Sequence, residues 1–481
     1  MAKWTRFFGI SLVLSLATWA SVQAQFDSGA GRVAEGRELF LHQWEPNDPL
    51  SPNGDGLGPL FNGKGCVNCH SLGGVGGSGN LANNAQFLSF LPETGEFTRR
   101  TAKKFLGTLH RMHPDFVDTQ GRFSLGVLLH RESTNPEFVS KRADVTATLP
   151  STNQSKARIL KMLSRRDLPK INALPLNLVI FHEGVQYALA ERNPPQLFGV
   201  DEIDRKISDS DIDALVEIQK GSTTGVSGRK SGRFGWRGQM KDLDLFIKGA
   251  CATEIGLQVH EFHQTKDPLQ PDYELEGSDL SGEQVNALIQ YVRSLPRPEQ
   301  VLPAEEKGKQ RIAEGQISFN AIGCAECHVA DVGQVSGVFS DFLLHDMGPL
   351  FEDPIPAEPL PEISVGANMD VISGYHGMVR REPAPLLAID QQHHMEYRTP
   401  PLWGVADSAP YMHDGRAQTL RGAIEWHGGE AKTSVRRFAL MSEEKQYALI
   451  QFLQSLKAPQ SAEEAPAGIS VTAEASHGVA R

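Results

Sequence analysis

The amino-acid sequence predicts a mainly α-helical fold made of two tandem domains of the same plan, with a large insertion in the first. Three features occur twice in the same order along the 481 residues: an amphipathic segment, a Cys-x-x-Cys-His pentapeptide and a closing amphipathic segment. The closing segments share an Ala-Leu-Ile-Gln core, with apolar residues at helical spacing. The amphipathic segments are Gly31–Trp44 and Ser281–Leu295 in the first half, and Ala304–Phe319 and Ser442–Leu456 in the second.

Each pentapeptide, Cys66–His70 and Cys324–His328, is a complete attachment motif for a c-type haem. Cysteines three residues apart can each form a thioether with a haem vinyl group, and the histidine that follows lies under the iron. A zinc site would need a second ligand pair nearby, and a redox dithiol has no need of the histidine. The sequence therefore predicts two covalently bound c-type haems as cofactors. The predicted attachment residues are Cys66, Cys69, Cys324 and Cys327, and the predicted proximal iron ligands are His70 and His328.

A helix, a haem motif, loops and a closing helix form, in this order, a small cytochrome c domain. We therefore expect two such domains, at 25–299 and 300–458, with the first and last helices of each crossing. Residues 459–481 have too little apolar content to pack and are predicted to be a disordered tail.

The first domain has about 120 residues between Cys69 and Arg192, far more than an ordinary loop. An insertion at about 81–190 is therefore predicted. The runs 103–112 and 157–166 are expected to be helices, which makes the insertion mainly helical.

The N-terminal residues have the pattern of a signal peptide. Lys3 and Arg6 precede the apolar run Phe7–Ala20, and Val22–Ala24 offers small residues at the cleavage-specifying positions. The run of about 14 apolar residues is shorter than the roughly 20 that span a bilayer. We therefore expect residues 1–24 to be removed, leaving no stable membrane span, and the mature protein to be periplasmic or otherwise exported.

The formal net charge of −11 argues against nucleic acid as a partner. Between Arg99 and Lys170, however, fifteen Lys/Arg stand against six Asp/Glu. This basic stretch could dock an acidic redox protein, although a solvated surface is the alternative. The expected partner is a redox protein or a small electron donor.

The internal repeat continues between the haem motifs and the closing segments. Arg192–Val200 matches Arg398–Val405 once a one-residue insertion is allowed, and Phe234–Leu243 parallels Tyr411–Leu420. This alignment places Trp236 opposite His413, and Ala250 opposite His427.

The second half offers a distal iron ligand. Thr419 can cap a helix on which Leu420, Ile424 and His427 fall on one face. An imidazole on that apolar face can reach the iron opposite the proximal histidine, so His427 is the predicted sixth ligand. A buried histidine satisfied by a backbone carbonyl is the alternative. The other distal candidates are Met347, His345 and His413.

The first half has Ala250 where the second has His427. Its haem must find a sixth ligand elsewhere or keep an open position, and an open iron can bind peroxide or another small oxidant. Glu254 could move protons in such a pocket, with a surface carboxylate as the alternative. The ligand candidates are His110, His113, His130, His182 and the thiol of Cys251, which could instead be a buried structural cysteine.

With these residues in place, the chain resembles the bacterial di-haem cytochrome c peroxidase superfamily. It is most similar to the di-haem oxidoreductase branch, often labelled peroxidase or thiol oxidoreductase-like. The likeness covers most of Gly31–Leu456. The segments that carry it are GDGLGPLFNGKGCVNCHSLGGVGG, RFGWRGQMKDL, FSDFLLHDMG, YRTPPLWGVA, YMHDGRAQTL and AIEWHGGEA.

The resemblance implies roles for three residues. In the superfamily, the residue fourteen beyond the histidine of Tyr-x-His-Asp-Gly supplies the distal group of the C-terminal haem, and here that residue is His427. Trp236 corresponds to the tryptophan between the haems, and Glu254 to the glutamate of the N-terminal pocket. One departure is Phe246, which replaces a glutamine ten residues after the tryptophan; two residues are also missing before Glu254. Loss of a pocket hydrogen-bond partner should weaken peroxide cleavage.

The sequence thus predicts a periplasmic di-haem c-type oxidoreductase of peroxidase-like type. Electrons would pass from the C-terminal haem to a reactive N-terminal haem, with Trp236 and Glu254 as the candidate catalytic residues. A non-catalytic di-haem cytochrome that only relays electrons is the alternative.

Overall fold

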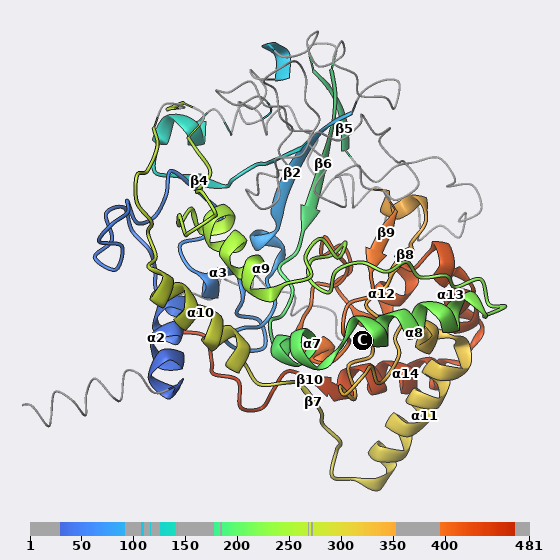
Figure 1. Cartoon of the computed structure of the whole chain (residues 1–481). Helices are drawn as coiled ribbons and strands as arrows, with labels where there is room; N and C mark the ends of the chain where they lie inside the picture. The colour runs from blue at the N-terminus through green and yellow to red at the C-terminus, as the bar shows by residue number, and fades with distance from the viewer. Residues whose placement is uncertain are drawn as a thin grey trace, which may run out of the picture.

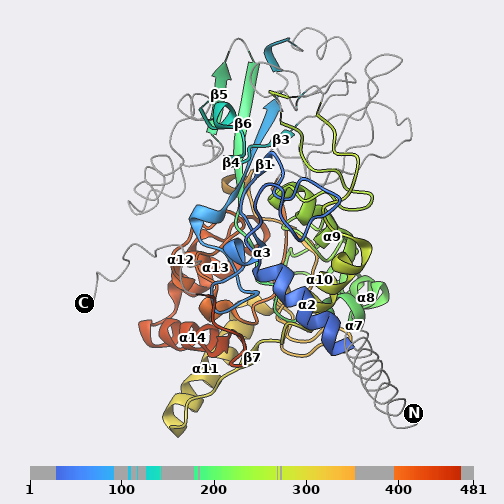
Figure 2. The same cartoon turned by 90° about the vertical axis from the view of Figure 1, so that its left-hand side faces the viewer.

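The computed structural model describes residues 29–91, 107–109, 116, 126–140, 142, 178–182, 185–267, 269–270, 273–352 and 395–466. The predicted signal peptide and the run 157–166 lie outside these residues. The described part of the chain is rich in helix. Two helix pairs lie on opposite sides of the lower part of the molecule, and a sheet rises above them (Figures 1 and 2).

The first pair consists of α2 (Gly29–Leu41) and α10 (Gly282–Ser294). The α10 helix begins after Ser281, whose side chain accepts a hydrogen bond from the Gln284 backbone while the Gln284 side chain accepts one from the Ser281 backbone. Buried apolar residues of the two helices face each other, and the rings of Phe40 and Tyr291 meet edge to face at 5.3 Å.

The second pair consists of α11 (Glu306–Ile322) and α14 (Glu443–Ser455). Ser442 caps α14, and Phe319 of α11 meets Phe452 of α14 at 5.4 Å. All four amphipathic segments named in the sequence are therefore helices, and in each half the first helix packs on the last.

Both pairs cross at a glycine. A β-carbon on Gly36 would overlap the carbonyl oxygen of Ala287, and one on Gly315 would overlap that of Ala448. The two alanines begin the Ala-Leu-Ile-Gln cores of the closing helices. The same contact at the same point of the repeat allows the helices to approach closely in both halves.

A haem motif follows the first helix of each pair. In the first half it forms α3 (Cys66–Cys69), and in the second a short 3-10 turn, η5 (Cys324–Glu326). Shorter helices complete the two halves. They are α7 (Val200–Lys206), α8 (Asp209–Lys220), α9 (Leu243–Ala250) with its π-helical extension η4 (Cys251–Ile255), α12 (Leu420–Trp426) and α13 (Lys432–Leu440).

The described part of the insertion is mainly a sheet, so the prediction of a mainly helical insertion is wrong there. Four antiparallel strands pair in the order β3-β2-β6-β5. The long central pair joins residues a hundred positions apart, from Ala85↔Arg192 to Leu91↔Gln186, which a search for local helical periodicity does not detect. Of the run 103–112, only 107–109 is described, and it is helical. The strands are β2 (Ala85–Leu91), β3 (Gly126–Leu128), β5 (Leu178–His182) and β6 (Val185–Arg192).

Three two-stranded ladders tie distant segments together. The first joins the insertion to the loop before the first haem motif, the second lies inside the second half, and the third links the closing helix of the second half to the chain after α10. They are β1 (Leu60–Phe61) with β4 (Glu132–Ser133), β8 (Leu344–Asp346) with β9 (Glu396–Arg398), and β7 (Glu299–Gln300) with β10 (Leu456–Lys457).

The start of the predicted disordered tail is packed, which corrects that prediction for 459–466. The Val75 backbone donates to the Glu463 carbonyl at 2.7 Å, and the Glu463 side chain accepts from Arg37. Ala462 and Ala465 pack against the core of the first half. This segment, which we call the strap (458–466), therefore runs from the second half onto the loop after His70. Residues 467–481 lie outside the described ranges.

Among the helices that the structure describes, none is long and apolar enough to cross a membrane.

The glycine crossing predicts a steric effect on stability. Gly36→Ala should lower the free energy of unfolding by about 1–3 kcal/mol, because the added methyl group forces α2 away from α10 even though alanine favours a helix. Gly282→Ala is the matched control, since a β-carbon there meets nothing within 4 Å. Urea unfolding of both variants measures the difference. Equal stability of Gly36→Ala and the parent protein would show that the helices do not cross this closely.

Candidate haem sites

In the second half, two histidines face each other across a gap. The Nδ1 atom of His328 lies 3.0 Å from the Phe339 carbonyl oxygen, and that of His427 lies 2.7 Å from the Ala423 carbonyl oxygen. The ring centroids of the two histidines are 6.4 Å apart. Since Nδ1 of each ring is held by a carbonyl, Nε2 is the nitrogen that remains available to a metal.

The 6.4 Å separation fits an iron between the rings. A histidine nitrogen lies about 2 Å from a bound metal, and about 1 Å from the centre of its own ring, so two rings on opposite sides of one ion stand about 6 Å apart. Burial lowers the pKa of His328 to about 4 and also lowers that of His427. Both imidazoles are therefore neutral at pH 7, which is the form that binds a metal.

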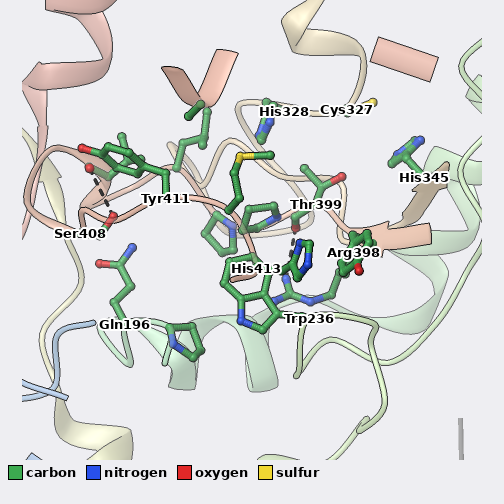
Figure 3. Close-up of a pocket in the computed structure, with 18 of the residues that line it drawn as sticks. Gln196, Trp236, Cys327, His328, His345, Arg398, Thr399, Ser408, Tyr411 and His413 are labelled. Atoms are coloured by element: carbon green, nitrogen blue, oxygen red, sulfur yellow. Dashed lines mark hydrogen bonds between the residues drawn. The ribbon is translucent and has the colours of Figure 1, made fainter. Parts of the chain in front are cut away.

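A cavity of about 280 Å³ lies beside these histidines and reaches residues of both halves. Figure 3 shows His328 on one side of it and Trp236 with His413 on the other. Cys324, Cys327 and Met347 also line the cavity. Met347 therefore stays a distal candidate beside His427.

His345 has other partners, which argues against its predicted alternative role as a distal ligand. Its Nε2 lies 2.8 Å from Asp341, and its Nδ1 lies 2.8 Å from Glu430. Burial opposes a charge on His345, but hydrogen bonds to Asp341, Cys327 and Glu430 outweigh it and raise the pKa to about 12. Both ring nitrogens thus carry protons at neutral pH. Asp341 is in turn held by Gln219 of α8 at 2.8 Å.

Cys327, Asp341 and His345 also offer atoms within 4.8 Å of one another, as a metal site would. A thioether at the predicted attachment residue Cys327 would leave only Asp341 and His345, which form the charged contact already described. His413 is engaged as well, since its ring stacks on Tyr397 at 4.1 Å.

Trp236 lies between the two halves. Its Nε1 donates to the Asn193 carbonyl at 2.8 Å, and its ring meets that of His413 edge to face at 6.5 Å. The two residues occupy equivalent turns, because the bridge Phe234↔Met240 around Trp236 has the same spacing as Tyr411↔Ala417 around His413. The predicted alignment of Trp236 with His413 agrees with this geometry.

The helices after these turns begin alike and end differently. Asp242 caps α9 and Thr419 caps α12, as predicted for Thr419. The α12 helix ends at Trp426, so that His427 leaves the helix beside His328. The α9 helix instead continues past Ala250 into the π-helical turn η4, which carries Glu254.

In the first half, His70 is oriented in the same way as the other two. Its Nδ1 lies 3.0 Å from the Pro195 carbonyl oxygen and 3.2 Å from that of Gly77. Burial lowers the pKa of His70 to about 4, so its ring is neutral. Cys251 lies near Cys66, and burial raises the pKa of its thiol to about 12. The protonated thiol favours the structural role of Cys251 over thiolate ligation.

Glu254 is held inside this site, so the surface-carboxylate alternative does not apply. Its Oε2 accepts a hydrogen bond from Asn62 Nδ2 at 2.7 Å, and its backbone carbonyl accepts one from the Asn62 backbone. Burial raises the pKa of Glu254, while the Asn62 hydrogen bond and the charge of Arg131 oppose the shift. A raised pKa makes this carboxyl group easier to protonate, so that it can take up and release a proton in a reaction.

His130 packs behind the π-helical turn. Its Nε2 lies 2.8 Å from the Thr253 carbonyl oxygen, and burial lowers its pKa to about 4. The contact leaves Nδ1 of His130 available, so His130 stays a candidate for the sixth ligand. His182 ends β5, whereas His110 and His113 lie outside the described residues.

Sequence reasoning missed two residues of this site. Asn62 stands in one of the segments that carry the family resemblance, so it could have been named. Arg131 had no signal, because its position follows from the sheet and the β1–β4 ladder. Phe246, at the position of the missing glutamine, instead packs against Phe234 with ring centroids 6.4 Å apart.

Residues 389–456 match the profile of the family described as "Di-haem oxidoreductase, putative peroxidase". The C-terminal part of this chain is therefore similar to the di-haem oxidoreductase family. This confirms the resemblance inferred from the motifs. The similarity supports haem cofactors and an oxidoreductase role.

One similar protein is the hydrazine synthase subunit gamma of Kuenenia stuttgartiensis, 26% identical over 195 residues. The match covers 39% of this chain and 52% of the relative, or about half of the relative's length.

Two solved structures show partial likeness at 18% identity. A xenon-pressurised hydrazine synthase of Kuenenia stuttgartiensis has a TM-score of 0.27 and covers 56% of this chain and 73% of its own. A MauG-like protein associated with microbial copper homeostasis has a TM-score of 0.22, with coverage of 37% and 57%.

The charged contact at His345 predicts a large, pH-dependent loss of stability. His345→Gln leaves the buried Asp341 and the partly buried Glu430 without their cation, which should cost about 3–5 kcal/mol. Because the folded pKa of about 12 lies above the ordinary value of 6.5, this stabilisation is complete below pH 6.5 and is lost as the pH rises toward 12. Urea unfolding at several pH values measures the effect.

The control is the double variant His345→Gln/Glu430→Gln, which removes one of the stranded carboxylates and should recover part of the loss. A loss that is the same at every pH and in both variants would mean that only packing was disturbed.

Proposed function

We propose that this protein is an exported, peroxidase-like di-haem c-type oxidoreductase built from two tandem cytochrome c-like domains. The C-terminal haem receives electrons, and the N-terminal haem reacts with a small oxidant. The observation that carries the proposal is the difference between the halves. His427 faces His328 at 6.4 Å, whereas α9 holds no histidine and leads instead to Glu254.

The residues present suit two haems of unlike coordination. His70 would bind the N-terminal iron, and His328 and His427 would both bind the C-terminal iron. The cysteines that form the thioethers are Cys66, Cys69, Cys324 and Cys327. When bound, the haems supply one-electron redox chemistry and, in the N-terminal site, a metal position that an oxidant can occupy.

The chain holds the ligand rings and the route between the halves in fixed positions. Carbonyl groups at Pro195, Phe339 and Ala423 fix the orientation of the three imidazoles. The hydrogen bond from Trp236 to Asn193 fixes an aromatic ring between the halves. Electron transfer benefits, because neither the ligands nor the intervening ring must reorganise.

Glu254 handles the protons of the reaction. Reduction of hydrogen peroxide consumes two protons and two electrons and yields two water molecules; the electrons come from a donor redox protein. Because Asn62 donates to Oε2, the proton is expected on Oε1 of Glu254. From there it can be delivered to the oxidant.

His427→Ala should change the C-terminal haem alone. Loss of the distal imidazole either converts the C-terminal iron from low spin to high spin or leaves it with a weaker sixth ligand. Both thioether attachments remain. Absorption and EPR spectra of the purified holoprotein measure the spin state, and intact mass under denaturing conditions should still show two haems. Met347→Ala is the comparison variant, because Met347 lines the same cavity. If Met347→Ala and not His427→Ala changes the spectrum, the ligand assignment is wrong.

Glu254→Gln should slow the reaction of the half-reduced protein with hydrogen peroxide by about 10²- to 10⁴-fold, since the amide group of glutamine cannot transfer the proton. Cyanide binding should remain. Stopped-flow spectroscopy measures the rate, and Glu261→Gln, an exposed glutamate that follows the same π-helical turn, should react like the parent protein. Two irons that stay six-coordinate and inert toward peroxide in every redox state would support the non-catalytic electron relay instead.

A further inference from the structure

Arg131 reaches the N-terminal haem site from the insertion. The β1–β4 ladder pairs Phe61 with Glu132, which places the residues on either side, Asn62 and Arg131, next to each other. The Arg131 backbone donates to Asn62 Oδ1 at 3.1 Å, and the same Asn62 side chain donates to Glu254 at 2.7 Å. Asn62 therefore ties the arginine and the glutamate into one unit.

The guanidinium group of Arg131 lies near the haem motif. It donates to the Asn84 carbonyl, and Cys69 and Glu254 lie within range of its charge. Cys69 is the second predicted attachment cysteine, so the positive charge would stand close to a haem attached there and beside the proton-handling carboxyl. An arginine keeps its charge at every physiological pH and presents several donors in a plane.

The carboxylates of Glu254, Glu191 and Glu132 lie within range of the Arg131 charge. Glu132 is exposed to solvent, which screens its charge, and the carboxylate of Glu191 also accepts hydrogen bonds from Asn84 and Gln86. Proton uptake by Glu254 removes the buried negative charge beside the arginine. A site with a fixed cation and a carboxyl that can be protonated favours a ligand that arrives as an anion, or one that becomes an anion by leaving its proton on Glu254.

We propose that Arg131 is the anion-binding group of the N-terminal haem site and that this site takes small monovalent anions. Azide is such an anion, and hydrogen peroxide yields another, hydroperoxide, when its proton passes to Glu254. The inference rests on the proposed function, since it needs an N-terminal iron that accepts an external ligand. It adds a substrate class and supplies a polar group to a pocket in which Phe246 replaces the expected glutamine.

The test compares an anion with a neutral ligand on the holoprotein. Sodium azide and imidazole are titrated into the parent protein, Arg131→Gln and Arg131→Lys, in the oxidised and half-reduced states, and the haem absorption spectrum reports each dissociation constant. Arg131→Gln should weaken azide binding by about 10- to 100-fold, as for a lost hydrogen bond to a charged group. Imidazole affinity should change by less than about 3-fold, and Arg131→Lys should recover most of the azide affinity.

Arg142→Gln is the matched control. Arg142 is another partly buried arginine of the insertion, and it donates to the His130 carbonyl and to Gln86, whereas the arginine charge that acts on Glu254 is that of Arg131. Its replacement should leave both affinities close to those of the parent protein.

Three outcomes would overturn the proposal. Unchanged azide affinity in Arg131→Gln would refute it while leaving the proposed function intact. An equal loss of azide and imidazole affinity that Arg131→Lys also shows would assign Arg131 a purely structural role. Failure of azide to bind the parent protein in either redox state would overturn the proposed function together with this inference.

Discussion

The hydrogen bonds that hold histidine Nδ1 atoms on backbone carbonyls are the constraint on which the rest of the structure depends. His70 is held by Pro195 and Gly77, His328 by Phe339 and His427 by Ala423. Each bond selects the ring tautomer and leaves Nε2 for iron. The Pro195 carbonyl belongs to a segment far along the chain from His70. The His70 ring is therefore oriented only when that segment packs beside it.

Both halves share the same arrangement of helices and turns, and they differ from each other near the haem sites. The crossing at Gly36 and Gly315 and the turns around Trp236 and His413 are the same in each half. The halves diverge after the next helix. The second half presents the His427 imidazole there, whereas the first half continues into the π-helical turn η4. Such turns are frequent at functional sites. The insertion contributes Arg131 to the first site through the β1–β4 ladder, so the two sites differ in the groups that surround them.

What could be predicted from the sequence is local. The four amphipathic helices, the caps at Ser281 and Thr419, and the haem motifs all depend on residues within one or two turns of each other. The His427 position followed from the repeat, because an alignment transfers geometry from one half to the other. The family resemblance supplied Trp236 and Glu254.

What could not be predicted depends on contacts between distant residues. The β2 strand pairs with a strand about a hundred residues later, and Glu463 of the strap meets Arg37 from the other end of the chain. Neither partner is visible in a short stretch of sequence, so the sequence alone predicts a helical insertion and a disordered strap. Asn62 and Arg131 share this origin, since their meeting depends on a ladder formed across the insertion.

The central claim is that the two irons differ in coordination. EPR spectroscopy of the purified holoprotein, in the oxidised and half-reduced states and with the signals integrated per haem, tests it most directly. The account predicts one low-spin haem with two histidine ligands and, in at least one of these states, a second haem that is high spin or takes up azide. Two low-spin haems of the same type that ignore added ligand in both states would contradict it.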